Sequence, residues 1–324
     1  MMALRQVAIL GDGGWGTALA MTLLQNGHAV RVWGPFPDYI AKIQRTRENR
    51  KFLPGVRLPP EITWTSERED AVGGADVVVL AVPSRFFKGV VTSFSETIPS
   101  NALVVSVAKG LDQETHLRMS ETAHVALGRG PVAALSGPSH AEEVARGVPT
   151  AVVIACADHG QAQQLQRVFS GPAFRVYTSD DIVGVELGGA LKNIIAIAAG
   201  ISDGIGFGDN TKAALITRGL AEITRLGCAA GAHPATFAGL SGMGDLIVTC
   251  ASKLSRNRAV GERLGRGEKI DDILADMEQV AEGVWTCGAA RALAQEAGVE
   301  VPIANEVHAV IRERKDPRAA VQAL

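Results

Sequence analysis

Residues 7–33 read VAILGDGGWGTALAMTLLQNGHAVRVW, and this stretch decides the fold. It begins with a short apolar run, Val7–Leu10, and passes through a glycine-rich turn into a helix-forming segment, Thr17–Gln25. Gly27 ends that segment, and a second apolar run follows at Ala29–Trp33. Two apolar runs joined by a helix within about 30 residues are typical of a βαβ unit with parallel strands.

The turn of this unit carries Gly11, Gly13 and Gly16 in the pattern G-x-G-x-x-G. In this pattern the first glycine permits a tight turn, the second lets a pyrophosphate approach the backbone, and the third lets helix and strand pack closely. The N-terminus of the following helix offers free N–H groups and partial positive charge to the pyrophosphate. The context predicts dinucleotide binding, with an ordinary glycine-rich turn as the alternative.

The residues after the second strand leave the choice of dinucleotide open. An NAD site usually has an acidic residue about 20 residues beyond the glycines, at the end of that strand. Here the chain reads Gly34-Pro35-Phe36, and Asp38 is expected to fall within the next helix. Since no arginine follows the strand closely, a site for the 2′-phosphate of NADP is equally unproven.

The two halves of the chain differ in their patterns. Short apolar runs alternate with helix-capable segments in the first half, at Val77–Val82, Leu103–Val107, Val132–Leu135 and Ala151–Ala155. Apolar strands spaced by helices predict a doubly wound parallel sheet covered on both faces. Beyond Tyr177 the chain is rich in Ala-, Leu- and Ile-based helical patterns. We therefore expect an α/β domain over residues 1–180 and an all-α domain over 181–324.

Composition restricts the function classes. Apolar residues make up 47% of the 324 residues, which excludes intrinsic disorder, and 32 Lys and Arg balance 34 Asp and Glu, which argues against a polyanion binder. The four cysteines and seven histidines lack metal-ligand spacing, so we expect no metal. The start of the chain lacks a signal-peptide core, and the apolar stretch Ile194–Ile201 is too short for a membrane span. A cytoplasmic protein is expected.

Three clusters in the second half carry candidate chemistry. Lys192-Asn193 lies within a long apolar helix, where the lysine either reaches solvent or is held in a cleft with a lowered pKa. Asp245, in the turn Gly242–Asp245, either caps the next helix or orients a hydroxyl or the lysine. Ser255–Arg258 is either a solvated basic first turn or an anion pocket with Ser255 as N-cap.

Two loops of the first half follow predicted strands. Lys109 comes after the run Leu103–Val107, and Ser136–Ser139 ends the next run. Ligands of parallel sheets bind at the carboxyl ends of the strands, so Lys109 is placed to meet a substrate anion or hydroxyl. The alternative is an exposed loop lysine.

Taken together, these residues resemble the bacterial-type NAD(P)-dependent glycerol-3-phosphate dehydrogenases over about residues 5–315. The matching stretches include GDGGWGTALA (11–20), AKGL (108–111), SGPSHAEEVA (136–145), GVELGGALKNIIAIAAGISDGIGFGDN (184–210), LSGMGDLIVTC (240–250), SRNR (255–258) and VAEGVWT (280–286). The resemblance implies a Rossmann domain followed by a helical domain like that of 6-phosphogluconate dehydrogenase. It also implies reversible reduction of dihydroxyacetone phosphate to sn-glycerol 3-phosphate, which supplies the glycerophospholipid backbone.

The resemblance further implies roles for individual residues. Lys192 matches the proton acceptor and donor of the reaction. Substrate positions are matched by Lys109, Gly137, Ser139, Lys192, Asp245, Ser255, Arg256 and Asn257. Cofactor positions, beyond Gly11, Gly13 and Gly16, are matched by Gly14, Trp15, Lys109, Ala141, Arg256, Val280 and Glu282. NAD(P)H is the implied cofactor, and a homodimer is the implied assembly.

Two other functions remain as alternatives. A related two-domain dehydrogenase acting on a carboxylate substrate, such as a β-hydroxyacid, would share the glycines and the Lys192-Asn193 helix. The Ser255–Asn257 cluster and Asp245 argue against it. A dinucleotide sensor without turnover would have no need of a proton-transfer lysine.

Overall fold

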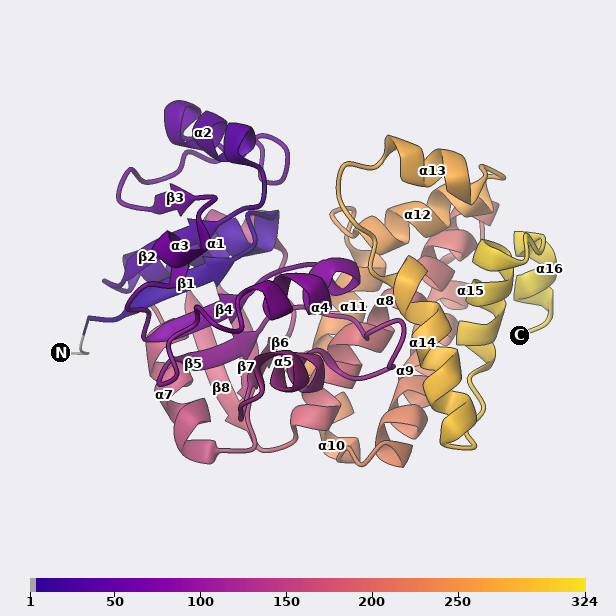
Figure 1. Cartoon of the computed structure of the whole chain (residues 1–324). Helices are drawn as coiled ribbons and strands as arrows, with labels where there is room; N and C mark the ends of the chain where they lie inside the picture. The colour runs from indigo at the N-terminus through magenta and orange to yellow at the C-terminus, as the bar shows by residue number, and fades with distance from the viewer. Residues whose placement is uncertain (1–3) are drawn as a thin grey trace. The chain divides into compact units, whose positions relative to one another are not determined.

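The computed structural model describes residues 4–324, which form two compact units (Figure 1). The sheet unit contains residues 4–108, 119–135 and 139–182, and the helical unit contains residues 109–118, 136–138 and 183–324. The chain passes from the sheet unit to the helical unit after residue 182. Two short segments belong to the helical unit although the chain around them lies in the sheet unit: Lys109–Arg118, which comes after the strand Leu103–Ser106, and Ser136–Pro138, which begins at the last residue of the strand Ala133–Ser136.

An eight-stranded sheet forms the centre of the sheet unit (Figure 1). Its strands, in chain order, are β1 (Gln6–Leu10), β2 (Ala29–Trp33), β3 (Thr63–Thr65), β4 (Val77–Leu80), β5 (Leu103–Ser106), β6 (Ala133–Ser136), β7 (Thr150–Ala155) and β8 (Phe174–Ser179). They lie in the order β3-β2-β1-β4-β5-β6-β7-β8. The pairs β3–β2, β2–β1, β1–β4, β4–β5, β5–β6 and β7–β8 are parallel. The predicted doubly wound sheet is confirmed.

Seven helices connect these strands. They are α1 (Gly14–Gln25), α2 (Pro37–Thr46), α3 (Arg68–Val72), α4 (Ser84–Ser93), α5 (Met119–Leu127), α6 (Ala141–Ala145) and α7 (His159–Phe169). β4 is buried at all four positions because helices cover both faces of the sheet. The chain reverses its winding direction between β1 and β4, so the carboxyl ends of these two strands form the topological switch point where such sheets bind ligands.

The helical unit is built around one long buried helix, α8 (Ile182–Ile205), whose residues are buried at every position from Gly184 to Ser202. The other helices are α9 (Asp209–Ala229), α10 (Pro234–Phe237), the π-helix η1 (Leu240–Gly244), α11 (Asp245–Ala251), α12 (Arg256–Gly265), α13 (Ile270–Asp276), α14 (Gly283–Glu296), α15 (Pro302–Arg312) and α16 (Pro317–Gln322). By length and composition α8 could cross a membrane, but 89% of its apolar window is buried inside the protein. It is the core helix of this unit.

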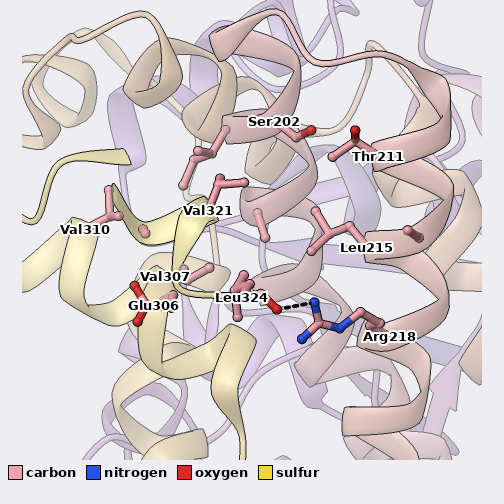
Figure 2. Close-up of a pocket in the computed structure, with 13 residues that line it drawn as sticks. Ser202, Thr211, Leu215, Arg218, Glu306, Val307, Val310, Val321 and Leu324 are labelled. Carbon is pink, nitrogen blue, oxygen red and sulfur yellow. Dashed lines mark hydrogen bonds between the residues drawn. The ribbon is translucent and has the colours of Figure 1, made fainter. Parts of the chain in front are cut away.

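An apolar cavity of about 150 Å³ lies in the helical unit, lined by residues of α8, α9, α15 and the C-terminal segment (Figure 2). Most of its lining side chains are aliphatic, among them Ile201, Leu215 and Val310. At its edge the guanidinium of Arg218 donates a hydrogen bond of 2.6 Å to the backbone oxygen of Leu324. The C-terminal residue is thereby tied to α9.

Candidate active site

The glycine-rich turn has the backbone geometry that its sequence predicts. Gly11 has a φ of 123°, a region that favours glycine, and a Cβ there would clash with the carbonyl of Ala81. A Cβ on Gly16 would likewise clash with the carbonyl oxygen of Gly11. Both positions therefore require glycine, one for the turn and one for close packing of α1 against the strand.

The start of α1 is suited to binding an anion. The helix begins at Gly14, three residues earlier than the predicted Thr17, with Gly13 as its N-cap. Gly13 has no side chain to cap the first-turn N–H groups, and a Cβ on it would meet nothing within 4 Å. First-turn N–H groups without a side-chain cap, next to a glycine with room around it, are what a dinucleotide pyrophosphate requires, so the residues present fit that group.

Three further predicted cofactor positions lie around this turn. Gly14 and Trp15 form the first turn of α1, and Ala141 begins α6, which packs against α1. A Cβ on Gly14 would lie 3.6 Å from the Cβ of Ala141. The other predicted cofactor residues, Lys109, Arg256, Val280 and Glu282, belong to the helical unit.

The residues that follow β2 include a closely packed glycine, Gly34, and an exposed aromatic residue, Phe36. A Cβ on Gly34 would lie 2.7 Å from the Cγ of Asp12, and Phe36 is 62% exposed. Burial raises the pKa of the Asp12 carboxyl. Asp38 lies in the first turn of α2, as the sequence predicts.

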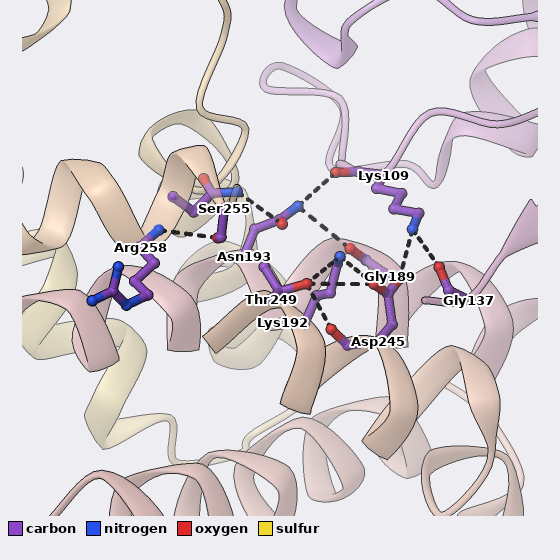
Figure 3. A network of polar contacts seen from close by, with 10 residues as sticks. Lys109, Gly137, Gly189, Lys192, Asn193, Asp245, Thr249, Ser255 and Arg258 are labelled. Atoms are coloured by element: carbon purple, nitrogen blue, oxygen red, sulfur yellow. Dashed lines mark hydrogen bonds and ion pairs between the residues drawn. The ribbon is translucent and has the colours of Figure 1, made fainter. Parts of the chain in front are cut away.

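In the helical unit, Lys192 is enclosed among polar partners (Figure 3). Its ammonium donates hydrogen bonds to a carboxylate oxygen of Asp245 and, at 2.7 Å, to the hydroxyl of Thr249. The Lys192 side chain is 7% exposed and that of Asp245 is 1% exposed. The alternative of a lysine reaching out to solvent is therefore wrong.

Asp245 binds a second lysine with its other oxygen. The ammonium of Lys109 donates hydrogen bonds of 2.7 Å to Asp245 Oδ2 and 2.8 Å to the carbonyl of Gly137 (Figure 3). The Lys109 side chain is mostly buried, so the alternative of an exposed loop lysine is also wrong. Two cations thus share one anion, which leaves a net positive charge next to Lys192.

The capping role considered for Asp245 is wrong. Asp245 is the first residue of α11, preceded by Gly244, and no side chain caps that helix. The π-helix Leu240–Gly244 runs directly into α11, so the chain has no extended N-cap residue at this point. The carboxylate is directed instead toward the two lysines.

These contacts set the charge states of the pair. Burial, together with the charge of Lys109, lowers the pKa of Lys192 to about 8, against the opposing effect of Asp245. Burial alone would raise the pKa of Asp245, but the two neighbouring ammonium groups outweigh it and hold that pKa below its usual range. The site therefore pairs a permanent carboxylate with a lysine that can exchange its proton near neutral pH.

The sequence pattern did not single out Thr249 and gave no role to Asn193, yet both belong to this network. Thr249 lies one helical turn after Asp245 and donates a hydrogen bond back to the carbonyl of Asp245. Its i+4 spacing from Asp245 was the available signal. Asn193 donates a 3.0 Å hydrogen bond to the carbonyl of Lys109, which joins the Lys109 segment to α8.

The predicted anion-binding turn begins α12. Ser255 is the N-cap, and its hydroxyl accepts a hydrogen bond of 3.2 Å from the N–H of Arg258. Asn257 is buried and donates to Asn193 Oδ1 at 2.9 Å, while its own oxygen accepts from the N–H of Gly283 at 2.8 Å. Arg256 is exposed at the first helical position.

Asn257 links this turn to a second predicted segment. Because Gly283 follows Glu282 directly, the hydrogen bond from its N–H holds the end of the segment Val280–Glu282 beside the start of α12. Gly137 contributes its carbonyl to Lys109, and Ser139 is half-buried in the sheet unit. Within the helical unit, the predicted residues Lys109, Gly137, Lys192, Asp245 and Asn257 belong to one connected hydrogen-bond network.

Known proteins resemble this chain over almost its whole length. The family model for the NAD-dependent glycerol-3-phosphate dehydrogenase N-terminus matches residues 6–162, and that for the C-terminus matches residues 181–322. A Geobacillus kaustophilus glycerol-3-phosphate dehydrogenase [NAD(P)+] is 50% identical over 99% of this chain and 94% of its own length.

Solved structures give the same result. The glycerol-3-phosphate dehydrogenase of Coxiella burnetii has a TM-score of 0.95 at 38% identity, covering 98% of both chains. The enzyme from yeast, Saccharomyces cerevisiae, has a TM-score of 0.82 at 25% identity, covering 99% of both chains. The chain belongs to the NAD-dependent glycerol-3-phosphate dehydrogenase family.

Proposed function

We propose that this protein catalyses the reversible reduction of dihydroxyacetone phosphate to sn-glycerol 3-phosphate with NAD(P)H, and that Lys192 transfers the proton. The observation that carries the proposal is the buried Lys192–Asp245 pair within a chain that matches the family over its whole length. A buried lysine with a pKa of about 8 is suited to give and take a proton near neutral pH.

When bound, NAD(P)H supplies the hydride that reduces C2 of the substrate. The glycine turn Gly11–Gly16, with Ala141 beside it, would hold the pyrophosphate at the N-terminus of α1. We also assign Lys109, Arg256, Val280 and Glu282 to the cofactor site, following the family pattern. In this division residues 1–180 carry the glycine turn that holds the dinucleotide, and residues 181–324 carry the lysine that transfers the proton.

Lys192 acts on the oxygen at C2. In the reductive direction its ammonium donates a proton to the carbonyl oxygen as negative charge develops there. In the oxidative direction the neutral amine accepts the proton of the C2 hydroxyl. Asp245 and Thr249 hold the Lys192 nitrogen in place by the hydrogen bonds described above.

Lys109 supplies the second positive charge. Its ammonium is fixed by Asp245 and the carbonyl of Gly137, so no reorganisation is required when the substrate arrives. Because one carboxylate serves two ammonium groups, the surplus positive charge favours both an anionic substrate and an alkoxide-like transition state.

The phosphate of the substrate would bind at the start of α12. There Ser255, Arg256 and Asn257 combine a helix N-terminus with a guanidinium that can bind a phosphate in a bidentate manner. Gly137 and Ser139 complete the substrate positions. Binding the phosphate at a distance from C2 provides energy for aligning the reacting atoms.

We further propose that the enzyme acts in the cytoplasm as a homodimer and supplies glycerol 3-phosphate to glycerophospholipid synthesis. The test of the enzymatic assignment is oxidation of NADH or NADPH, followed at 340 nm after addition of dihydroxyacetone phosphate. Substrate-dependent oxidation supports the assignment, and the ratio of the two kcat/KM values gives the cofactor preference. A folded protein that binds a dinucleotide and oxidises neither cofactor would refute it.

A further inference from the structure

We propose that Arg258 and Asp203 are positioning residues, whose ion pair fixes the phosphate-binding turn of α12 relative to Lys192 on α8. The pair would thereby set the carbonyl-to-phosphate distance that the enzyme accepts in its substrate. This inference rests on the proposed function, because it assigns the phosphate to the start of α12.

The ion pair is largely shielded from solvent and has several contacts. The Nε and Nη2 atoms of Arg258 lie 2.9 Å and 2.8 Å from Asp203 Oδ2, and Lys212 reaches the other carboxylate oxygen at 2.7 Å. The side chains of Arg258 and Asp203 are only 13% and 11% exposed. Glu262, one turn further along α12, pairs with Arg258 at 3.2 Å. A guanidinium held on both sides in this way has little freedom to move.

The ion pair is one of two attachments between the start of α12 and α8. Asn257 is hydrogen-bonded to Asn193, the neighbour of Lys192, and Arg258 is bound to Asp203, ten residues further along α8 than Asn193. Because two adjacent residues of α12 are bound to points ten residues apart on α8, both rotation and sliding of the α12 start are restricted. Arg256, which immediately precedes these two residues, is held in place by their attachments.

The two helices also touch through their backbones. A Cβ on Gly200 of α8 would clash with the carbonyl oxygen of Arg258, and a Cβ on Gly261 of α12 would clash with the carbonyl oxygen of Ile197. One turn further along each helix, a Cβ on Gly204 would clash with the carbonyl oxygen of Glu262, and a Cβ on Gly265 would clash with that of Ile201. Because backbone atoms meet with no side chain between them, a methyl group added at these glycines must push the two helices apart.

This arrangement makes the distance between the proton-transfer group and the phosphate site a fixed property of the α8–α12 pair. In dihydroxyacetone phosphate the carbonyl and the phosphate are separated by a single CH₂–O link. A displacement of about 1 Å at the phosphate is enough to reduce a reaction rate about 100-fold when reacting atoms are misaligned. A rigid helix pair therefore selects for a ketose phosphate of this length.

The first test separates positioning from folding. The Arg258→Met variant keeps the aliphatic stem and removes the charge, and the matched control Arg263→Met removes an α12 arginine that pairs with Glu268 and Asp276 instead. For each protein kcat/KM is measured with dihydroxyacetone phosphate and with dihydroxyacetone, which lacks the phosphate. The kcat/KM for dihydroxyacetone phosphate divided by that for dihydroxyacetone measures how much the phosphate group increases the rate.

We expect this ratio to fall at least about tenfold in Arg258→Met, with activity on dihydroxyacetone retained and with partial rescue in Arg258→Lys. Asp203→Asn should lower the ratio in the same way, and Arg263→Met should leave it at the wild-type value. An Arg258→Met enzyme whose two activities fall in parallel, or do not fall, overturns the proposal. Wild-type protein that does not reduce dihydroxyacetone phosphate would instead refute the proposed function.

The second test changes the helix spacing itself. Gly200→Ala forces α12 away from α8, whereas Gly288→Ala places its new methyl group in open space on α14 and serves as the control. The probe is erythrulose 4-phosphate, whose carbonyl lies one carbon further from the phosphate. For each variant, kcat/KM for erythrulose 4-phosphate is divided by kcat/KM for dihydroxyacetone phosphate. This ratio should be about tenfold or more higher in Gly200→Ala than in the wild type. An unchanged ratio in a folded variant contradicts a distance-setting role for the helix pair.

Discussion

Lys192 and Asp245 form an ion pair in which both side chains are buried, although 53 residues separate them in the sequence. Asp245 offers its second oxygen to Lys109, so the carboxylate is saturated by two cations. A buried charge of this kind is costly unless it is fully paired, and here the pairing leaves one of the two ammonium groups able to lose its proton.

Removing the Lys192 amine should abolish proton transfer while sparing the dinucleotide site. In Lys192→Ala we expect kcat with dihydroxyacetone phosphate to fall at least ~10²-fold, because a positioned acid–base group contributes that much. The dissociation constant for NADH, measured by fluorescence titration, should remain close to the wild-type value. Near-normal turnover would remove Lys192 from the mechanism.

Removing the charge of Asp245 should shift the pH profile toward acid. Asp245 raises the pKa of Lys192 against the effect of burial, so Asp245→Asn should lower that pKa below about 8. Reduction needs the protonated lysine, and its rate should therefore begin to fall at a lower pH than in the wild type. The measurement is kcat/KM for dihydroxyacetone phosphate against pH; a descending limb that stays in place or moves to higher pH would contradict this coupling.

Arg256 should matter for binding the phosphorylated substrate. In Arg256→Ala we expect KM for dihydroxyacetone phosphate to rise at least about tenfold, since a hydrogen bond to a charged group contributes about 1.5–3 kcal/mol. Arg266→Ala, at the exposed end of the same helix, is the matched control and should leave KM unchanged. If steady-state kinetics give the same KM and kcat for both variants, phosphate binding by Arg256 is wrong.

The two glycines of the turn should respond differently to a methyl group. Gly16→Ala introduces a clash with the Gly11 carbonyl and should lower the free energy of unfolding by about 1–3 kcal/mol. Gly13→Ala meets open space, so its thermal unfolding should match the wild type while KM for NAD(P)H rises about tenfold. A Gly13→Ala protein with unchanged KM would show that the pyrophosphate does not approach this backbone.

Local patterns were sufficient to predict most of the sheet, but not its edges. The runs that became β1, β4, β5 and β6 are apolar because those strands are almost wholly buried, and the runs of β2 and β7 are apolar enough to be recognised although parts of these strands are only half-buried. The short strand Thr63–Thr65 and the strand Phe174–Ser179 were not predicted. They form the two edges of the sheet, where alternation with polar residues or short length weakens the apolar signal.

The site shows the same division between local and long-range information. Ser255 as an N-cap follows from adjacent residues and was predicted correctly. The roles of Asp245 and Lys109 depend on partners 53 and 136 residues away, so spacing alone left a cap and an exposed lysine as alternatives. The Arg258–Asp203 pair joins two helices and could not be inferred before their packing was known.

The central claim is that Lys192 exchanges the substrate proton, and the pH dependence of kcat/KM in both directions tests it most directly. Reduction of dihydroxyacetone phosphate needs the ammonium form and should decline as the pH rises through about 8, the pKa of Lys192. Oxidation of glycerol 3-phosphate needs the neutral amine and should increase over the same range. Opposite limbs with a shared apparent pKa are the predicted result. Limbs that run in the same direction, or that persist in Lys192→Ala, would contradict the assignment.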